Sequence, residues 1–213
     1  MTDHVKLARA GAVLEVTLNR ATKKNALTGA MYRKMTGALQ TASDDADIRA
    51  VLFLGDGDAF SAGNDLNDFL EGTDGGAPAL EFIRALAAFG KPIVAAVQGL
   101  AVGIGTTMLF HCDLVYAAPD ARFLMPFVNL GLVPEAGSSL LAPLRLGHAK
   151  AAAMLQATCP AQIPEDTTAR LDAMSKRLKA TVTAMNEVKP ALTGFYDSLS
   201  DEQKARFNTM PSQ

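Results

Sequence analysis

The stretch Ile93-Val-Ala-Ala-Val97, continued by Gln98-Gly-Leu-Ala-Val-Gly-Ile-Gly-Thr-Thr107, decides the fold. Five consecutive apolar residues predict a buried strand, and the glycines after them predict a tight turn into a helix. The run Ala50-Val-Leu-Phe-Leu54 has the same character and leads to a second glycine-containing turn, Ala59-Phe-Ser-Ala-Gly-Asn-Asp-Leu66. Apolar strands that alternate with helices indicate an α/β fold with sheets covered on both faces.

The flanking sequence predicts further strands and helices. Val13 to Leu18 and Leu114 to Ala117 have strand patterns, whereas Thr28 to Thr41 and Ala79 to Phe89 have helical ones, with Thr28 as an N-cap. Gly72 to Pro78 is glycine-rich and is expected to form a flexible loop near the entrance to the site. Beyond Pro164 we expect helices only, because apolar residues recur there at helical spacing: Leu171, Met174, Leu178, Val182 and Met185.

The composition limits the class of protein. With 213 residues, 49% of them hydrophobic, and a formal net charge of −2, the chain suits one globular core with a helical appendage. It has no apolar run of the ~18 residues that a membrane span requires, and its N-terminus lacks a secretory pattern, so we expect no membrane and a cytoplasmic location. Without clustered Lys and Arg we expect no nucleic acid. Cys112 and Cys159 have neither disulfide nor metal-site spacing, so both are expected to be reduced and no metal is expected.

The two glycine turns are the candidate site. A turn at the start of a helix leaves backbone N–H groups unpaired, and such groups favour developing negative charge. Two such turns side by side would form an oxyanion hole. A dinucleotide-binding loop is the alternative, but Gly99, Gly103 and Gly105 do not match the GxGxxG spacing, and no acidic residue stands at a strand end about 20 residues further on. Glycines used only for close helix packing are the remaining alternative.

Four motifs in this order resemble the crotonase, or enoyl-CoA hydratase/isomerase, superfamily from about Leu14 to Leu155. They are Leu18-Asn-Arg-Ala-Thr-Lys-Lys-Asn-Ala-Leu27, Phe60-Ser-Ala-Gly-Asn-Asp-Leu66, Lys91-Pro-Ile-Val-Ala-Ala-Val-Gln-Gly99 and Cys112-Asp113. The resemblance implies a spiral of ββα units and assembly as a homotrimer or hexamer. It also implies an acyl-CoA thioester as substrate. Coenzyme A is then part of the substrate, and no separate cofactor is expected.

The resemblance also assigns roles to single residues. It implies that the backbone N–H groups of Asn64 and Ile104 form the oxyanion hole and that Ala62 lies along the adenine side of the coenzyme. The other substrate-binding candidates are Gly63, Asp65, Leu66, Gly103 and Phe127. Lys23 and Lys24 could meet the coenzyme phosphates or lie in a solvated loop. His111, isolated in an apolar stretch, is expected to be a core histidine.

Two positions within the resemblance distinguish hydratases from isomerases of the family. The two glutamates typical of hydratases are replaced here by Thr107 and Phe127, so hydratase activity is not expected. The segment Met125-Pro-Phe-Val-Asn-Leu-Gly-Leu-Val-Pro-Glu-Ala-Gly-Ser-Ser139 is similar to peroxisomal-type Δ3,Δ2-enoyl-CoA isomerases and to chromodomain-Y-like proteins, which makes Glu135 the candidate catalytic base. The alternative for Glu135 is an acid in the first turn of a helix. For the protein, the alternatives are a non-catalytic acyl-CoA-binding or scaffold protein, or a crotonase-fold hydratase, hydrolase or decarboxylase.

The resemblance stops after Leu155. Members of the family continue there with a threonine–glycine step, a helix and an Ala-x-x-x-Gly-Leu-Val segment, whereas this chain passes through Gln156 to Pro164 into its last predicted helices. We therefore expect a more open acyl pocket. We divide the chain into a crotonase core, residues 1–155, and a C-terminal helical trimerisation region, residues 156–213.

Overall fold

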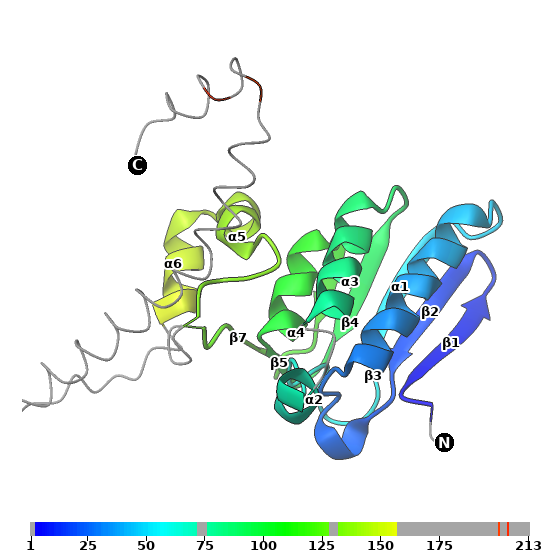
Figure 1. Cartoon of the computed structure of the whole chain (residues 1–213), viewed down its shortest axis with the longest axis horizontal. Coiled ribbons are helices and arrows are strands. Elements are labelled where there is room, and N and C mark those ends of the chain that lie inside the picture. The colour runs from blue at the N-terminus through cyan, green and yellow to red at the C-terminus, as the bar shows by residue number, and fades with distance from the viewer. Residues whose placement is uncertain (1–2, 72–75, 128–131, 157–199, 201–203, 205–213) are drawn as a thin grey trace, which may run out of the picture. The chain divides into compact units, whose positions relative to one another are not determined.

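The computed structural model describes residues 3–71, 76–127, 132–156, 200 and 204. The chain divides into two compact units, residues 1–159 and 160–213, and the elements below belong to the first. Figure 1 shows them in chain order by colour. The strands are β1 (Val5–Ala10), β2 (Val13–Leu18), β3 (Ala50–Gly55), β4 (Ile93–Val97), β5 (Leu100–Val102), β6 (Leu114–Ala117) and β7 (Arg122–Leu124). The helices are η1 (Ala21–Lys23), α1 (Gly29–Asp44), α2 (Leu66–Glu71), α3 (Ala77–Ala88), α4 (Ile104–Thr107), η2 (Met108–His111), α5 (Ser138–Leu146) and α6 (His148–Gln156).

The strands form two sheets. The larger has the order β1-β2-β3-β4-β6; β1 and β2 are antiparallel, and the remaining neighbours are parallel. The smaller is the parallel pair of β5 and β7. The parallel register places the carboxyl ends of β2, β3 and β4 at one edge of the larger sheet. The α/β class and the strands predicted at residues 13–18, 50–54, 93–97 and 114–117 are confirmed.

Helices α1 and α3 lie side by side across one face of the larger sheet (Figure 1). The apolar stripe of α1 faces the core, where Met31, Met35 and Leu39 are at most 2% exposed. The helix begins as predicted, because the Thr28 hydroxyl accepts a hydrogen bond from Met31 N–H at 3.3 Å. The sequence pattern therefore predicted both the boundary and the buried face of this helix.

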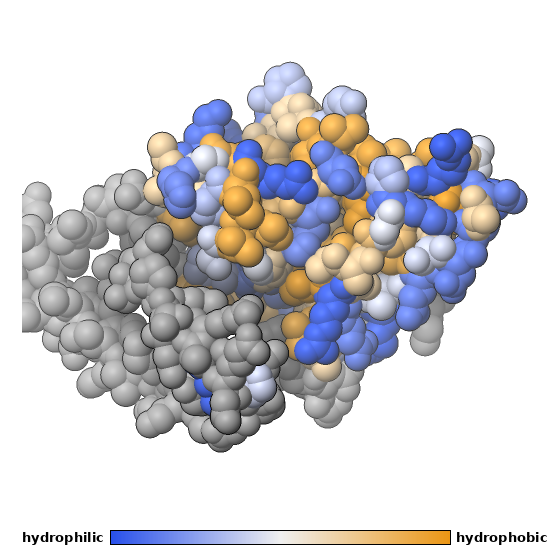
Figure 2. All heavy atoms as spheres, turned by 90° about the horizontal axis from the view of Figure 1, so that it is seen from above, coloured by the Kyte–Doolittle hydropathy of each residue, from blue (hydrophilic) through white to orange (hydrophobic). Residues whose placement is uncertain are grey.

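The other face of the larger sheet is less covered than we expected. In β4 buried and half-buried residues alternate, and all four residues of β6 are exposed, with Leu114 at 54% and Tyr116 at 66%. On the side of the molecule that Figure 2 shows, apolar residues also lie at the surface among polar ones. Within the described residues the expectation of cover on both faces is not met for β6, since an apolar run predicts burial but does not say which part of the chain provides it.

Several elements were not predicted, or differ from the prediction. The sequence patterns gave no expectation for β1, β7 or α2. The predicted loop at Gly72 to Pro78 is shorter, because α3 begins at Ala77 with Pro78 in its first turn, and residues 72–75 lie outside the description. The helices predicted beyond Pro164, Cys159 and, apart from residues 156, 200 and 204, the predicted trimerisation region also lie outside it. In the part that the structure does describe, no helix is long and apolar enough to cross a membrane.

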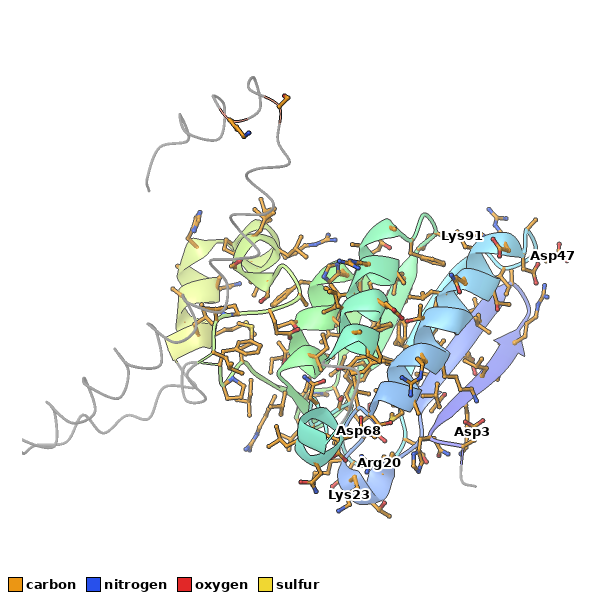
Figure 3. The ribbon with its side chains drawn as sticks, in the orientation of Figure 1. Asp3, Arg20, Lys23, Asp47, Asp68 and Lys91 are labelled. Carbon is orange, nitrogen blue, oxygen red and sulfur yellow. The ribbon has the colours of Figure 1, made fainter. Side chains whose placement is uncertain are left out.

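One lysine ties the helix layer to the sheet at the edge opposite the carboxyl ends. Lys91 Nζ donates hydrogen bonds to the carbonyls of Ala42, Asp45 and Ile48 at 2.5, 2.8 and 2.9 Å. These carbonyls belong to the end of α1 and the turn into β3, and Lys91 introduces β4. Figure 3 shows Lys91 and Asp47 at this end of the sheet.

Candidate active site

The candidate site lies at the carboxyl ends of the parallel strands. The first glycine turn, residues 59–65, follows β3. The second, residues 98–103, follows β4 and includes the short strand β5. Figure 3 shows Arg20, Lys23 and Asp68 at this same end, beside α2. The edge at which parallel strands end is where open α/β sheets bind ligands.

The two glycine turns pack directly against each other. Ser61 and Ala101 form a parallel bridge, and Val102 N–H donates to the Ser61 carbonyl at 2.9 Å. Gly63 has φ +90°, and a Cβ at that position would lie 2.8 Å from the Val102 carbonyl oxygen. A Cβ on Gly105 would lie 2.8 Å from the Ser61 carbonyl oxygen. Only residues without a side chain permit this approach, so the glycines bring the two backbones together.

In the first turn one backbone amide differs from its neighbours in its hydrogen bonding. The other amides donate hydrogen bonds: Ser61 to Leu100 O, Ala62 to Lys24 O, Gly63 to Ser61 Oγ, and Asp65 to Leu27 O. Within the described parts of the chain, the Asn64 N–H has no acceptor.

The second turn has the same feature. Gly103 N–H donates to Leu124 O, and the amides of Thr106 and Thr107 both donate to Gly103 O. Ile104 is 2% exposed, yet its N–H has no acceptor among the residues described, and neither has that of Gly105. Buried backbone N–H groups are nearly always paired, so the Ile104 amide suits a ligand oxygen, and the half-buried Asn64 amide on the adjacent turn can donate to the same kind of ligand.

Glu135 is held close to the second turn. The Thr107 hydroxyl, which is fully buried, donates a hydrogen bond to Glu135 Oε1 at 2.5 Å. Burial raises the pKa of the Glu135 carboxyl, and the Thr107 hydrogen bond opposes that rise. The alternative reading of Glu135 as an acid in the first helical turn is wrong, since α5 begins at Ser138 after two residues with positive φ, Ala136 and Gly137.

The backbone around Glu135 is also anchored. Its carbonyl accepts hydrogen bonds from Ser138 N–H at 3.0 Å and from the Ser138 hydroxyl at 2.6 Å. His111 Nε2 lies 2.8 Å from the carbonyl oxygen of Ala136. The expected core histidine is thus half-buried and bonded to the segment that carries Glu135, a role that nothing in the sequence around His111 indicated.

The first turn rests on Asn25, which the sequence reading did not single out. Asn25 is fully buried with φ +55°. Its Oδ1 accepts from Arg20 N–H, and its Nδ2 donates to the carbonyls of Asp56 and Ala59, each at 2.8 Å. Its own carbonyl accepts from the Ser61 hydroxyl at 2.9 Å. Its place inside a quoted motif was the available signal, because asparagine tolerates positive φ and satisfies several backbone groups.

The side chain of Asp65 is engaged in contacts within the protein. Its Oδ2 lies 2.6 Å from Arg20 Nη1, and its Oδ1 accepts from the amides of Asn67 and Asp68 at the start of α2. The hydrogen bond from Arg20 holds the pKa of the Asp65 carboxyl below its ordinary value. The carboxylate therefore caps α2 and anchors the turn. A contact with substrate stays a prediction for this residue.

A tyrosine from α1 reaches the first turn. The hydroxyl of Tyr32, which is 3% exposed, donates a hydrogen bond to Asn64 Oδ1. Burial raises the pKa of this hydroxyl, and the negative charge of Glu135 raises it further. Tyr32 thus contacts the turn that carries Asn64 and also senses the charge of Glu135. The sequence gave no signal for this contact beyond the position of Tyr32 in α1.

The remaining candidates differ in exposure. Phe127 is 5% exposed and packs in a small apolar cluster with Phe110 and Met125, whereas Leu66 is 62% exposed. Lys24 pairs with Asp58 at 3.1 Å on the surface. Ala62 and Gly103 lie in the two turns, and their contacts with substrate stay predictions. Across the ranges described, no group of three or more His, Cys, Asp or Glu residues is placed to hold a metal ion.

Comparison with known proteins identifies relatives. The family model described as enoyl-CoA hydratase/isomerase matches residues 8–169. A second model, described as LTXXQ motif family protein, matches residues 135–210, less than half of the chain.

Two relatives carry isomerase names. The chain is 45% identical over 153 residues to enoyl-CoA delta isomerase 2 of Rattus norvegicus, which covers 68% of this chain and 39% of the relative. It is 42% identical over 151 residues to enoyl-CoA delta isomerase 3, peroxisomal, of Mus musculus, covering 67% and 47%. The chain thus spans less than half the length of these two relatives.

Among solved structures, an enoyl-CoA hydratase/isomerase from Pseudoalteromonas atlantica matches with a TM-score of 0.71 at 35% identity. The match covers 96% of this chain and 88% of that one. The predicted crotonase fold is therefore confirmed.

Proposed function

The chain belongs to the enoyl-CoA hydratase/isomerase family, and we propose that it moves the double bond of a 3-enoyl-CoA thioester to the 2 position. One observation carries the proposal. Thr107, three residues after Ile104, donates its hydroxyl to Glu135, and the Ile104 amide has no acceptor among the residues that the structure describes. A carboxylate is thereby held beside a turn whose Ile104 N–H can donate to a ligand.

The reaction needs one base and two donors. The Glu135 carboxylate takes a proton from C2 of the substrate, and the electron pair moves toward the thioester carbonyl to give a dienolate. The N–H groups of Asn64 and Ile104 donate to the dienolate oxygen; a donor of this kind lowers the barrier by ~3–4 kcal/mol. The protonated Glu135 then returns its proton at C4, which leaves the double bond between C2 and C3.

The environment of Glu135 suits this exchange. A general base is most effective when its pKa lies near the working pH, because it must both accept and return the proton. Burial raises the pKa of Glu135 above its ordinary value and so moves it toward the working pH. The Thr107 hydroxyl limits the shift by stabilising the ionised form, so the carboxyl is available as a base.

Residues at the two other positions argue against hydration. Addition of water to a double bond requires a second acid–base group, so that one group activates the water and the other protonates the substrate carbon. Hydratases of the family use two glutamates for these roles. Here Thr107 already donates to Glu135, and Phe127 is buried in an apolar cluster. Neither side chain can act as a second carboxylate.

The test is a spectrophotometric assay with 3-hexenoyl-CoA, which follows the conjugated 2-enoyl thioester. We expect turnover by the native protein and a loss of ~10²–10⁴-fold in Glu135→Gln, the usual contribution of a general base. The matched control is Glu81→Gln, an exposed glutamate on α3, which should retain native activity.

Two results would refute the proposal. If Glu135→Gln kept native turnover, the base would lie elsewhere. If neither protein turned over substrate while both bound the thioester, the chain would be an acyl-CoA-binding or scaffold protein. A panel of saturated, malonyl-type and 2-enoyl thioesters tests the hydrolase, decarboxylase and hydratase alternatives in the same experiment.

Assembly and location are also proposals. We propose a homotrimer or hexamer in the cytoplasm, on the basis of the family and of the helical pattern beyond Pro164. Sedimentation of the purified protein measures the first, and a monomer would contradict it. Cell fractionation measures the second.

A further inference from the structure

Backbone hydrogen bonds on both sides of the Asn64 amide fix its orientation. The Gly63 carbonyl, which belongs to the same peptide plane as the Asn64 N–H, accepts a hydrogen bond from Leu27 N–H at 2.7 Å. Beyond it, Asp65 N–H donates to the Leu27 carbonyl at 2.9 Å. Because a peptide unit is planar, fixing its C=O also directs its N–H to the opposite side.

Between these two backbone bonds, the side chain of Asn64 has one described contact, the hydrogen bond from Tyr32. Tyr32 itself has little freedom. It is 3% exposed on α1, and its ring lies 5.7 Å from that of Phe82, centroid to centroid. The hydroxyl is thus a rigid donor from the core, and it fixes the residue whose N–H carries no partner in the described structure.

The Tyr32 hydroxyl also stays protonated. Burial and the charge of Glu135 both raise the pKa of this hydroxyl above its ordinary value, so it remains a donor near neutral pH. The effect of Glu135 further indicates that the hydroxyl lies within electrostatic reach of the candidate base.

We propose that Tyr32 is a positioning residue for the oxyanion hole: its hydroxyl holds the Asn64 carboxamide and so keeps the Asn64 N–H directed at the thioester oxygen. This inference rests on the oxyanion hole of the proposed function. Tyr32 itself does not touch the substrate, and it acts only through Asn64.

The test measures carbonyl polarisation without turnover. The probe is 2,4-hexadienoyl-CoA, whose ultraviolet band shifts to longer wavelength when donors polarise its thioester carbonyl. Tyr32→Phe keeps the ring and removes the hydroxyl. We expect a smaller red shift than in the native protein, with the dissociation constant changed by less than about threefold and kcat for 3-hexenoyl-CoA reduced by roughly tenfold at unchanged KM. Tyr116→Phe, at an exposed tyrosine of β6, is the control and should behave as the native protein.

A second variant makes the result specific. Asn64→Ala removes the acceptor of the Tyr32 hydroxyl, so it should also reduce the red shift, and adding Tyr32→Phe to it should have no further effect. This variant also tests the proposal if Tyr32→Phe does not fold.

The inference is overturned if Tyr32→Phe keeps the native red shift and kcat. It is equally overturned if the effects of the two substitutions add, or if the native protein gives no red shift. A native red shift that depends on Tyr32, without isomerase turnover, would refute the proposed function and leave this inference standing.

Discussion

Replacing Thr107 by valine should change how kcat/KM depends on pH. The value that kcat/KM reaches on the alkaline plateau should stay nearly the same. The substitution keeps the branched shape of a fully buried side chain and removes the hydroxyl that donates to Glu135 at 2.5 Å. A hydrogen bond to a charged group contributes about 1.5–3 kcal/mol. Because this bond stabilises the ionised carboxylate, its loss raises the pKa of Glu135 beyond the rise that burial already causes.

The assay is kcat/KM as a function of pH. On the acidic limb less of the variant carries an ionised base, so its kcat/KM should fall by roughly 10- to 150-fold, which is that energy expressed as an equilibrium ratio. On the alkaline plateau native and variant should agree within a few-fold. The matched control is Thr106→Val, since the buried Thr106 hydroxyl donates to the backbone carbonyl of Ala101 and to no carboxylate. The control should be less stable than the native protein and keep the native pH profile.

Two outcomes would refute this reasoning. An unchanged profile would mean that the hydroxyl does not act on the base. An equal loss at every pH would mean that Thr107 positions the substrate or the turn.

Three further predictions concern stability. Glu135→Gln should unfold at higher urea concentration than the native protein near neutral pH and equally in acid, because a carboxyl whose pKa is raised by folding stabilises below its ordinary pKa and loses that contribution as pH rises through the folded value; a variant that is less stable near neutral pH would contradict this. Asn25→Ala should lower the free energy of unfolding by about 3–5 kcal/mol, since three hydrogen bonds to backbone groups are lost at a buried site of positive φ; a cost below about 1 kcal/mol would be inconsistent with those contacts. Gly99→Ala should prevent folding at ordinary growth temperature, as measured by soluble yield and circular dichroism, because its Cβ would lie 1.9 Å from the Asp58 carbonyl oxygen; native yield would show that the turn can shift.

The regular part of the fold could be predicted because its signals are local. The apolar runs of β3 and β4 and the helical stripe of α1 depend only on neighbouring residues. The structure places both strands within one residue of the prediction, and α1 begins as predicted and ends three residues later than predicted. The edge strand β1 was missed because its sequence, Val-Lys-Leu-Ala-Arg-Ala, has two large apolar residues and a weak alternation, as suits a strand with five of its six residues exposed. Helix α2 is one and a half turns long and too short for a periodic signal.

The site was predictable only in part, for a physical reason. The glycine turns and Glu135 lie in recognisable stretches of sequence, and the structure brings Glu135 to Thr107. The supporting contacts join positions far apart in the chain, such as Tyr32 with Asn64 and His111 with Ala136. No local pattern encodes such pairs, because each partner alone is compatible with an ordinary core residue.

The candidate oxyanion donors are main-chain atoms, and this affects how the protein can change over evolution. A side-chain donor disappears with almost any substitution, whereas an N–H at position 64 or 104 is removed only by proline. Point mutations can therefore alter the charge, size and polarity around the thioester carbonyl while the donors persist. The side chains that can be exchanged without touching these donors include Glu135 and Thr107, so substitutions there can change the chemistry of the candidate site while both turns stay intact.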